Sequence, residues 1–146
     1  MRVVTLPNRN LAMQDIGFTH IALPVKSIEK SIAFYSVYAG LKVIHRREDV
    51  AWISDQLRPF AIVLIESDRE ISPLSPMAHL GIALASHAAV DAAFERARSD
   101  GIVVREPTED GPPVGYWGFI RDPDGHTLEL SFGQLVETAV VQPGSV

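Results

Sequence analysis

Three side chains that can ligate a metal ion stand far apart in the sequence: His20, His79 and Glu129. Two imidazoles and one carboxylate form a ligand set that leaves coordination positions open for a substrate on a first-row transition metal. The chain has no cysteine, so any bound metal must take nitrogen and oxygen ligands. Because the three residues are too widely spaced to share one loop, only the fold can bring them together.

The position of Glu129 follows from the turn that precedes it. Residues 122–125 read DPDG, in which proline presets φ and glycine supplies a positive φ, so a strand should follow over residues 126–132. Side chains alternate between the faces of a strand, so Leu128 and Leu130 share one face and Glu129 stands in the middle of the other. A carboxylate in that position needs water, a charged partner or a metal ion.

The two histidines occupy equivalent places in an internal repeat. The segment FTHIALPVKSIEKSIAFYSVYAGLKVI, which begins at Phe18, has the same pattern as MAHLGIALASHAAVDAAFERARSDGIVV, which begins at Met77. Each contains a histidine, an apolar run, a helical segment with an aromatic residue, a glycine and a β-type run. Two copies of one unit explain this pattern. If the units pair their sheets around a shared concavity, the two imidazoles and the carboxylate can converge there.

Each unit is predicted to fold as β-α-β-β-β, which makes the chain an α+β protein. The units span about 18–67 and 77–133 within one domain, 15–136, with an N-terminal extension, 1–14, and a C-terminal tail, 137–146. In the first unit we expect strands at 18–25, 41–46, 49–54 and 59–66 and a helix at about 27–36, capped by Ser27. In the second we expect strands at 79–85, 102–106, 116–121 and 126–132, a helix at 88–99 and a long loop at 107–115.

Composition limits the classes of function. The chain has 146 residues, 47% of them hydrophobic, and a net charge of -5 without any run of like charge, which argues against nucleic acid or a membrane surface as partner. No apolar run is long enough to cross a bilayer and no secretory signal is recognisable. Together with the absence of cysteine, these features predict a cytoplasmic protein that binds a small molecule.

Three motifs make the chain similar to a known family: THIALPVKSIEKSIAFY, MAHLGIAL and FIRDPDGHTLEL. They resemble the vicinal oxygen chelate superfamily, which includes glyoxalase I, extradiol dioxygenases, fosfomycin-inactivating thiol transferases, methylmalonyl-CoA epimerases and bleomycin-binding proteins. The resemblance covers about Phe18 to Leu135. It implies a curved mixed sheet of two βαβββ modules, usually in a homodimer. It also implies one divalent metal, Mn, Fe(II), Zn, Ni or Co, on His20, His79 and Glu129. Whether one chain or a dimer builds the site is left open.

The chain also departs from particular members of this family. Glyoxalase I and the epimerases carry a fourth ligand at a position that falls here on Val63 or Leu64, and Glu66 nearby is kept as a further candidate ligand. Phe119 stands where extradiol dioxygenases and fosfomycin transferases have a tyrosine. These departures favour a lyase, isomerase or thiol transferase over a ring-cleaving dioxygenase. The alternative is a metal-free antibiotic-binding protein, similar to the bleomycin-resistance proteins.

Further residues are assigned to the predicted site. Glu129 is expected to take part in catalysis, with Tyr116 as a proton donor. The other three histidines are expected to lack a catalytic role: His126 exposed in its turn, His45 on a charged edge, and His87 at the start of a helix. The residues expected to contact substrate are aromatic or cationic: Trp52, Arg58, Trp117, Phe119 and Arg121.

Overall fold

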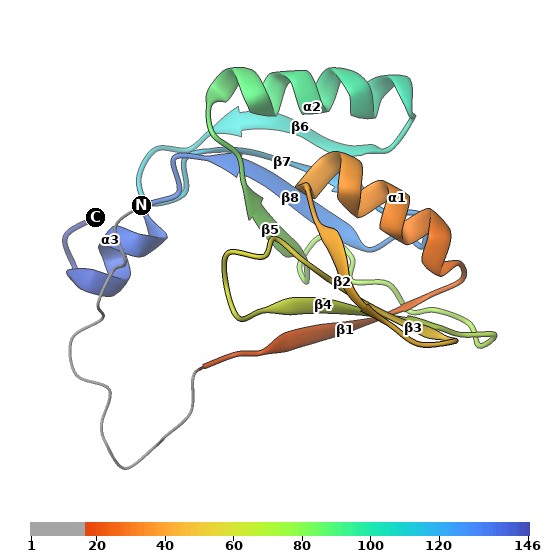
Figure 1. The fold of residues 1–146 in the computed structure, drawn as a ribbon. Helices are drawn as coiled ribbons and strands as arrows, with labels where there is room; N and C mark the ends of the chain where they lie inside the picture. Colours follow the sequence, from red (N-terminus) through yellow and green to blue (C-terminus); the bar gives the residue numbers. More distant parts are fainter. Residues whose placement is uncertain (1–16) are drawn as a thin grey trace, which may run out of the picture.

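The computed structural model describes residues 17–146, which form two four-stranded sheets (Figure 1). The first module contains β1 (His20–Val25), α1 (Ile28–Ala39), β2 (Lys42–Arg46), β3 (Val50–Ser54) and β4 (Ala61–Glu66). The second contains β5 (Leu80–Ala83), α2 (His87–Ser99), β6 (Val103–Glu109), β7 (Tyr116–Arg121) and β8 (Thr127–Phe132). The α+β class and both βαβββ modules are thus confirmed. The predicted N-terminal extension lies outside the described residues, and the predicted tail contains most of a short helix, α3 (Val136–Val141).

The two sheets have the same topology. Their strand orders are β1-β4-β3-β2 and β5-β8-β7-β6, with the first and last strand of each module paired in parallel. The repeat in the sequence is therefore a repeat of structure. In Figure 1, α1 lies between the first sheet and the strands of the second module, and α2 covers the far side of the second sheet. No helix within residues 17–146 is long and apolar enough to span a membrane.

The helix ends follow from local sequence. The hydroxyl of Ser27 accepts a hydrogen bond from the Lys30 N–H at 3.3 Å, and Gly40 ends α1 with φ 64°. The helix therefore runs three residues beyond the predicted end at Ser36, up to the residue before this glycine. A second acceptor at the start of α1 is Glu66 Oε2, which lies 3.0 Å from the Ile28 N–H. Glu66 caps this helix, so its side chain points toward α1 and away from the face of the first sheet that carries His20.

A buried polar contact joins the two modules. The Tyr35 hydroxyl, on α1, donates a hydrogen bond to Asp122 Oδ2 at 3.0 Å, and both residues are buried. Burial raises the pKa of the Asp122 carboxyl, and it also raises the pKa of the Tyr35 phenol. The turn before β8 is therefore fixed to the helix of the first module.

The expectation that His126 is exposed is wrong: its relative exposure is 1%. Its Nδ1 accepts a hydrogen bond from the Leu74 N–H at 3.0 Å, and its Nε2 donates to the Pro24 carbonyl at 2.8 Å. We call His126, Pro24 and Leu74 the His126 clamp. It joins the turn before β8, strand β1 and the segment between the modules, which were unrelated in the sequence pattern.

Gly118 on β7 is a position where any side chain should be destabilising. A Cβ there would lie 2.6 Å from Phe94 Cζ and 2.8 Å from the Arg105 carbonyl oxygen, and the backbone atom cannot turn aside. We expect Gly118→Ala to lower the free energy of unfolding by about 3 kcal/mol, measured by urea denaturation, because overpacking displaces the neighbouring strand. Gly81→Ala is the control, since its Cβ would meet nothing closer than 4.0 Å. Equal stability of both variants would contradict this account of the packing.

Candidate functional site

The centre of the candidate site is a histidine–carboxylate pair on the second sheet. His79 Nε2 lies 3.4 Å from Glu129 Oε2. His79 precedes β5, Glu129 lies on β8, and the two strands run in parallel side by side. Glu129 is 7% exposed, which is low for a carboxylate. Two of the three predicted ligands are therefore in contact within one chain.

Hydrogen bonds orient both members of this pair. His79 Nδ1 lies 3.0 Å from the Pro76 carbonyl, which can only accept, so the proton of the neutral ring is assigned to Nδ1. The lone pair on Nε2 then faces Glu129. On the other side, Gln134 Nε2 donates to Glu129 Oε1 at 2.6 Å. Outer partners of this kind fix the direction of metal ligands in proteins.

Aromatic rings line the sheet beside this pair. Phe119 is opposite Glu129 in the strand register, and its ring centroid lies 4.9 Å from that of His79. The ring of Trp117 lies 4.9 Å from that of Phe119. Two of the three predicted contact residues on β7, Trp117 and Phe119, therefore lie on the face that carries Glu129, as the alternation of side chains along the strand requires.

The side chain of Arg105 lies at the end of this row of rings. The guanidinium carbon of Arg105, on β6, lies 4.1 Å from the centroid of the Trp117 ring. Neither Arg105 nor Gln134 was predicted from the sequence. Alternation along β6 could have indicated Arg105, but the register of β6 against β7 shifts on both sides of it, and the sequence does not show such shifts.

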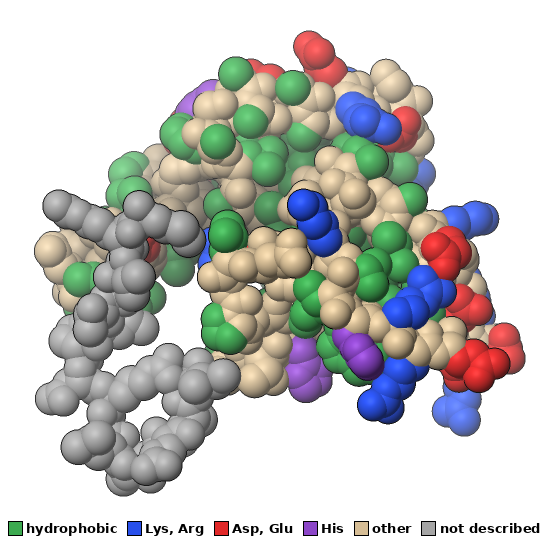
Figure 2. Space-filling model, viewed as in Figure 1, with side chains coloured by type: hydrophobic (Ala, Val, Ile, Leu, Met, Phe, Trp, Pro, Cys, Tyr) green, Lys and Arg blue, Asp and Glu red, His purple; other side chains and the backbone are tan. Residues whose placement is uncertain are grey.

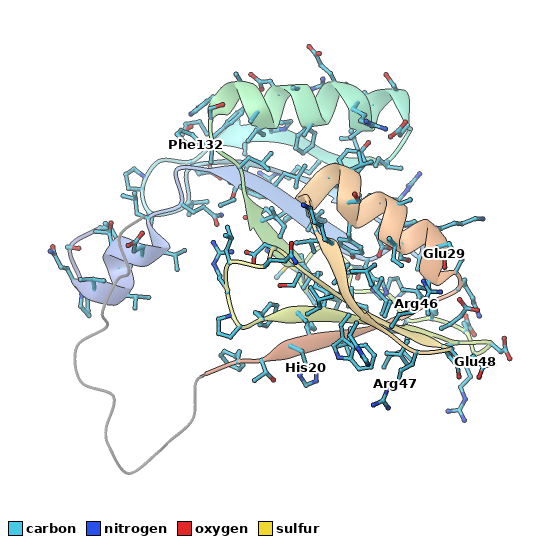
Figure 3. The ribbon with its side chains drawn as sticks, in the orientation of Figure 1. His20, Glu29, Arg46, Arg47, Glu48 and Phe132 are labelled. Atoms are coloured by element: carbon cyan, nitrogen blue, oxygen red, sulfur yellow. The ribbon has the colours of Figure 1, made fainter. Side chains whose placement is uncertain are left out.

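His20, the third predicted ligand, lies on the other sheet. Figure 3 shows its side chain pointing away from α1 and the second module, and its Nδ1 is 2.9 Å from Thr19 Oγ1. Trp52 is on the same face, where its ring contacts His45, and Figure 2 shows histidine and hydrophobic side chains together on this surface. Within residues 17–146, no three His, Cys, Asp or Glu side chains lie close enough to hold one ion. The structure thus unites His79 and Glu129 but leaves His20 apart.

Three other predicted residues lie away from Glu129. The Tyr116 hydroxyl points to α2 and donates to Asp91 Oδ1 at 2.6 Å, and this hydrogen bond raises the Tyr116 pKa. Arg58 pairs with Asp55 beside a hollow of about 140 Å³. Arg121 donates to the Gly101 carbonyl and lines a hollow of about 210 Å³ between α1 and the end of α2. The structure does not bring these three to the histidine–carboxylate pair.

The pair is suited to a divalent cation. Bonds of about 2.1 Å from one ion to nitrogen and oxygen place two ligands roughly 3.0 to 3.5 Å apart, which matches the distance between His79 and Glu129. A neutral imidazole nitrogen and a carboxylate oxygen both present lone pairs, so a metal ion between them would bond to both, whereas a protonated imidazole would form an ion pair with the carboxylate. The donor types suit Mn, Fe, Co, Ni or Zn.

Gln134 should increase the metal affinity of the His79–Glu129 pair without being a ligand itself. We expect Gln134→Ala to weaken the binding of Zn²⁺ or Mn²⁺ by about 10-fold, because outer hydrogen-bond partners contribute 10- to 100-fold to metal affinity. Competition against a fluorescent chelator measures the change. Gln142→Ala, at the end of α3, is the control, since Gln142 is exposed. Affinity equal to that of the unmodified chain would contradict the role given to Gln134.

The fold agrees with the comparisons with known proteins. The family model of the Glyoxalase/Bleomycin resistance protein/Dioxygenase superfamily matches residues 17–130, so the chain belongs to this superfamily. An uncharacterized protein of Pseudomonas aeruginosa, PA2024, is 37% identical over 123 residues, which cover 80% of this chain and 88% of that protein.

Two solved structures share this fold. The fosfomycin resistance protein FosX of Listeria monocytogenes superposes with a TM-score of 0.67 at 24% identity, over 83% of this chain and 96% of that one. TnmS3, an antibiotic-binding protein of a Streptomyces species, gives 0.64 at 20% identity, over 83% and 98%. At these identities the likeness shows the shared fold alone.

Proposed function

We propose that this protein is a metal-dependent enzyme that acts on a small molecule able to chelate the ion through two neighbouring oxygens. The observation that carries the proposal is the His79–Glu129 pair, in which a carboxylate that is only 7% exposed faces an imidazole nitrogen at 3.4 Å. Membership of the superfamily supports it. A lyase, an isomerase or a thiol transferase fits this site, and the metal would supply Lewis acidity.

We propose further that His20 reaches the ion from a second copy of the chain. His20 and Trp52 lie on the open face of the first sheet, and His79 and Glu129 lie on the second sheet. The residues that precede the two histidines expose apolar side chains, with Phe18 at 93% and Met77 at 98% exposure. Such exposure is typical of surfaces that a partner covers. A symmetric homodimer would complete two sites at once.

Within such a site the protein side chains have distinct roles. Glu129 would help to hold the ion, and its carboxylate is also the side chain beside the substrate that can accept a proton. Gln134 keeps one carboxylate oxygen in place. Phe119 and Trp117 exclude water from the substrate on one side, which strengthens the electrostatic interactions around the ion.

The competing function is metal-free binding of an aromatic antibiotic. The row of Trp117 and Phe119 rings favours it, since flat ligands stack on such rings. This function does not need the buried carboxylate to face an imidazole. The two functions therefore differ in whether the protein binds metal tightly.

The deciding experiment is the metal content of the full chain, purified without chelators and without a histidine-rich tag. We expect close to one transition metal ion per chain by mass spectrometry, or after reconstitution with Mn²⁺, Fe²⁺, Co²⁺, Ni²⁺ and Zn²⁺ in turn. Protein that stays empty with all five ions would contradict the proposal and favour the metal-free binder.

A further inference from the structure

Arg105 is an arginine without an ion pair among residues 17–146. Within the described part of the chain, no carboxylate lies within ion-pair distance of its guanidinium, whereas Arg98 pairs with Glu106 and Arg46 with Glu29. Contact with an aromatic ring nevertheless holds the side chain in position, because its guanidinium carbon lies 4.1 Å from the centroid of the Trp117 ring. Arginine on an aromatic face keeps its edge N–H groups free to donate two parallel hydrogen bonds to a carboxylate.

The platform under Arg105 is held in place. The Trp117 indole N–H donates to Asp110 Oδ2 at 2.8 Å, and Trp117 is buried. That hydrogen bond engages Asp110, which is the acidic side chain bonded to this platform. The guanidinium therefore rests on a fixed ring, and its position relative to the sheet is determined.

Arg105 and Glu129 belong to one row across the sheet. Arg105 is opposite Phe119, and Phe119 is opposite Glu129, on three neighbouring strands. Strands are about 4.8 Å apart, so the row places the arginine roughly 10 Å from the carboxylate. Between them lie aromatic surfaces, with the Phe119 ring 4.9 Å from both the Trp117 ring and the His79 ring.

From this row we infer that the protein takes a flat, conjugated carboxylate. Its carboxylate binds Arg105, its planar body lies against the small exposed part of Phe119 and Trp117, which are 8% and 9% exposed, and its neighbouring oxygens lie at the His79–Glu129 pair. The part of this inference that concerns the chelating oxygens rests on the proposed function. The part that concerns Arg105 does not, because the arginine and the two rings need no metal.

The test uses the full chain after removal of metal with EDTA, and a pair of probes that differ only in charge: 2-naphthoate and the neutral 2-naphthamide. Because the metal has been removed, neither probe can bind through an ion. In an NMR titration, the unmodified chain should bind the acid about fivefold or more tightly than the amide, since a charged hydrogen bond at an exposed site is partly screened. Arg105→Gln should bind both probes equally and the amide as before, whereas Arg46→Gln should keep the preference for the acid.

The outcomes separate this inference from the proposed function. Equal binding of acid and amide by the unmodified chain, no binding of either, or a preference that survives in Arg105→Gln would each overturn the role of Arg105. None of these results depends on metal. A protein that prefers the acid but never binds metal would support the arginine subsite and contradict the enzyme.

Discussion

Glu129→Gln and His79→Ala should each weaken the binding of Zn²⁺ or Mn²⁺ by more than about 100-fold, because each removes a ligand, and loss of even an outer partner costs 10- to 100-fold. Glutamine keeps the size of the Glu129 side chain and one oxygen but lacks the negative charge that offsets the ion. Competition with a chelator of known affinity gives the dissociation constants.

A second histidine–carboxylate pair serves as the matched control. His87 Nε2 lies 3.3 Å from Glu109 Oε2, nearly the same separation, but both side chains are about half exposed, at 54% and 51%. We expect His87→Ala to leave metal affinity unchanged. If Glu129→Gln keeps the affinity of the unmodified chain but unfolds at lower temperature, the His79–Glu129 contact is an ion pair and the metal site is elsewhere or absent.

Co-expression of two inactive variants should restore metal binding if the site is shared between chains. A His20→Ala chain and a Glu129→Gln chain each lack one ligand, so dimers of either variant have no complete site. In a mixed dimer, one site takes His20 from the second variant and Glu129 from the first and is complete. Random pairing in a symmetric dimer therefore predicts about one quarter of all sites intact.

The measurement is tight metal content per chain in the co-purified mixture, next to each variant purified alone. A site built within one chain cannot be rescued in this way, because each chain keeps its own defect. A mixture with no more metal than the separate variants would thus contradict the shared site, provided that size exclusion shows dimers. The same mixture should regain a corresponding fraction of any activity found.

The sequence predicted most of the fold because the signals for it are local or periodic. Ser27 and Gly40 mark the ends of α1, and the DPDG turn places Glu129 on its strand face. The proximity of His79 to Glu129 follows from pairing of the first and last strands in each module. The convergence of His20 on these two residues stays a prediction.

What the sequence missed depends on contacts between distant segments. His126 looks like an exposed turn residue, because its partners Pro24 and Leu74 lie on other segments of the chain. The role of Glu66 as a helix cap depends on the direction of its side chain toward α1. The position of Arg105 over the Trp117 ring depends on two register shifts in β6. None of these contacts produces a periodic pattern in the sequence.

The His126 clamp has a consequence for the proposed dimer. It fastens the segment between the modules at Leu74, and the Thr127 N–H adds a hydrogen bond of 2.7 Å to the Leu74 carbonyl. One module cannot swing away from the other without breaking these bonds and exposing the buried Tyr35–Asp122 contact. A dimer of this chain would therefore come apart by separation of whole, folded chains, and a change of partner would proceed at the speed of dissociation rather than of unfolding.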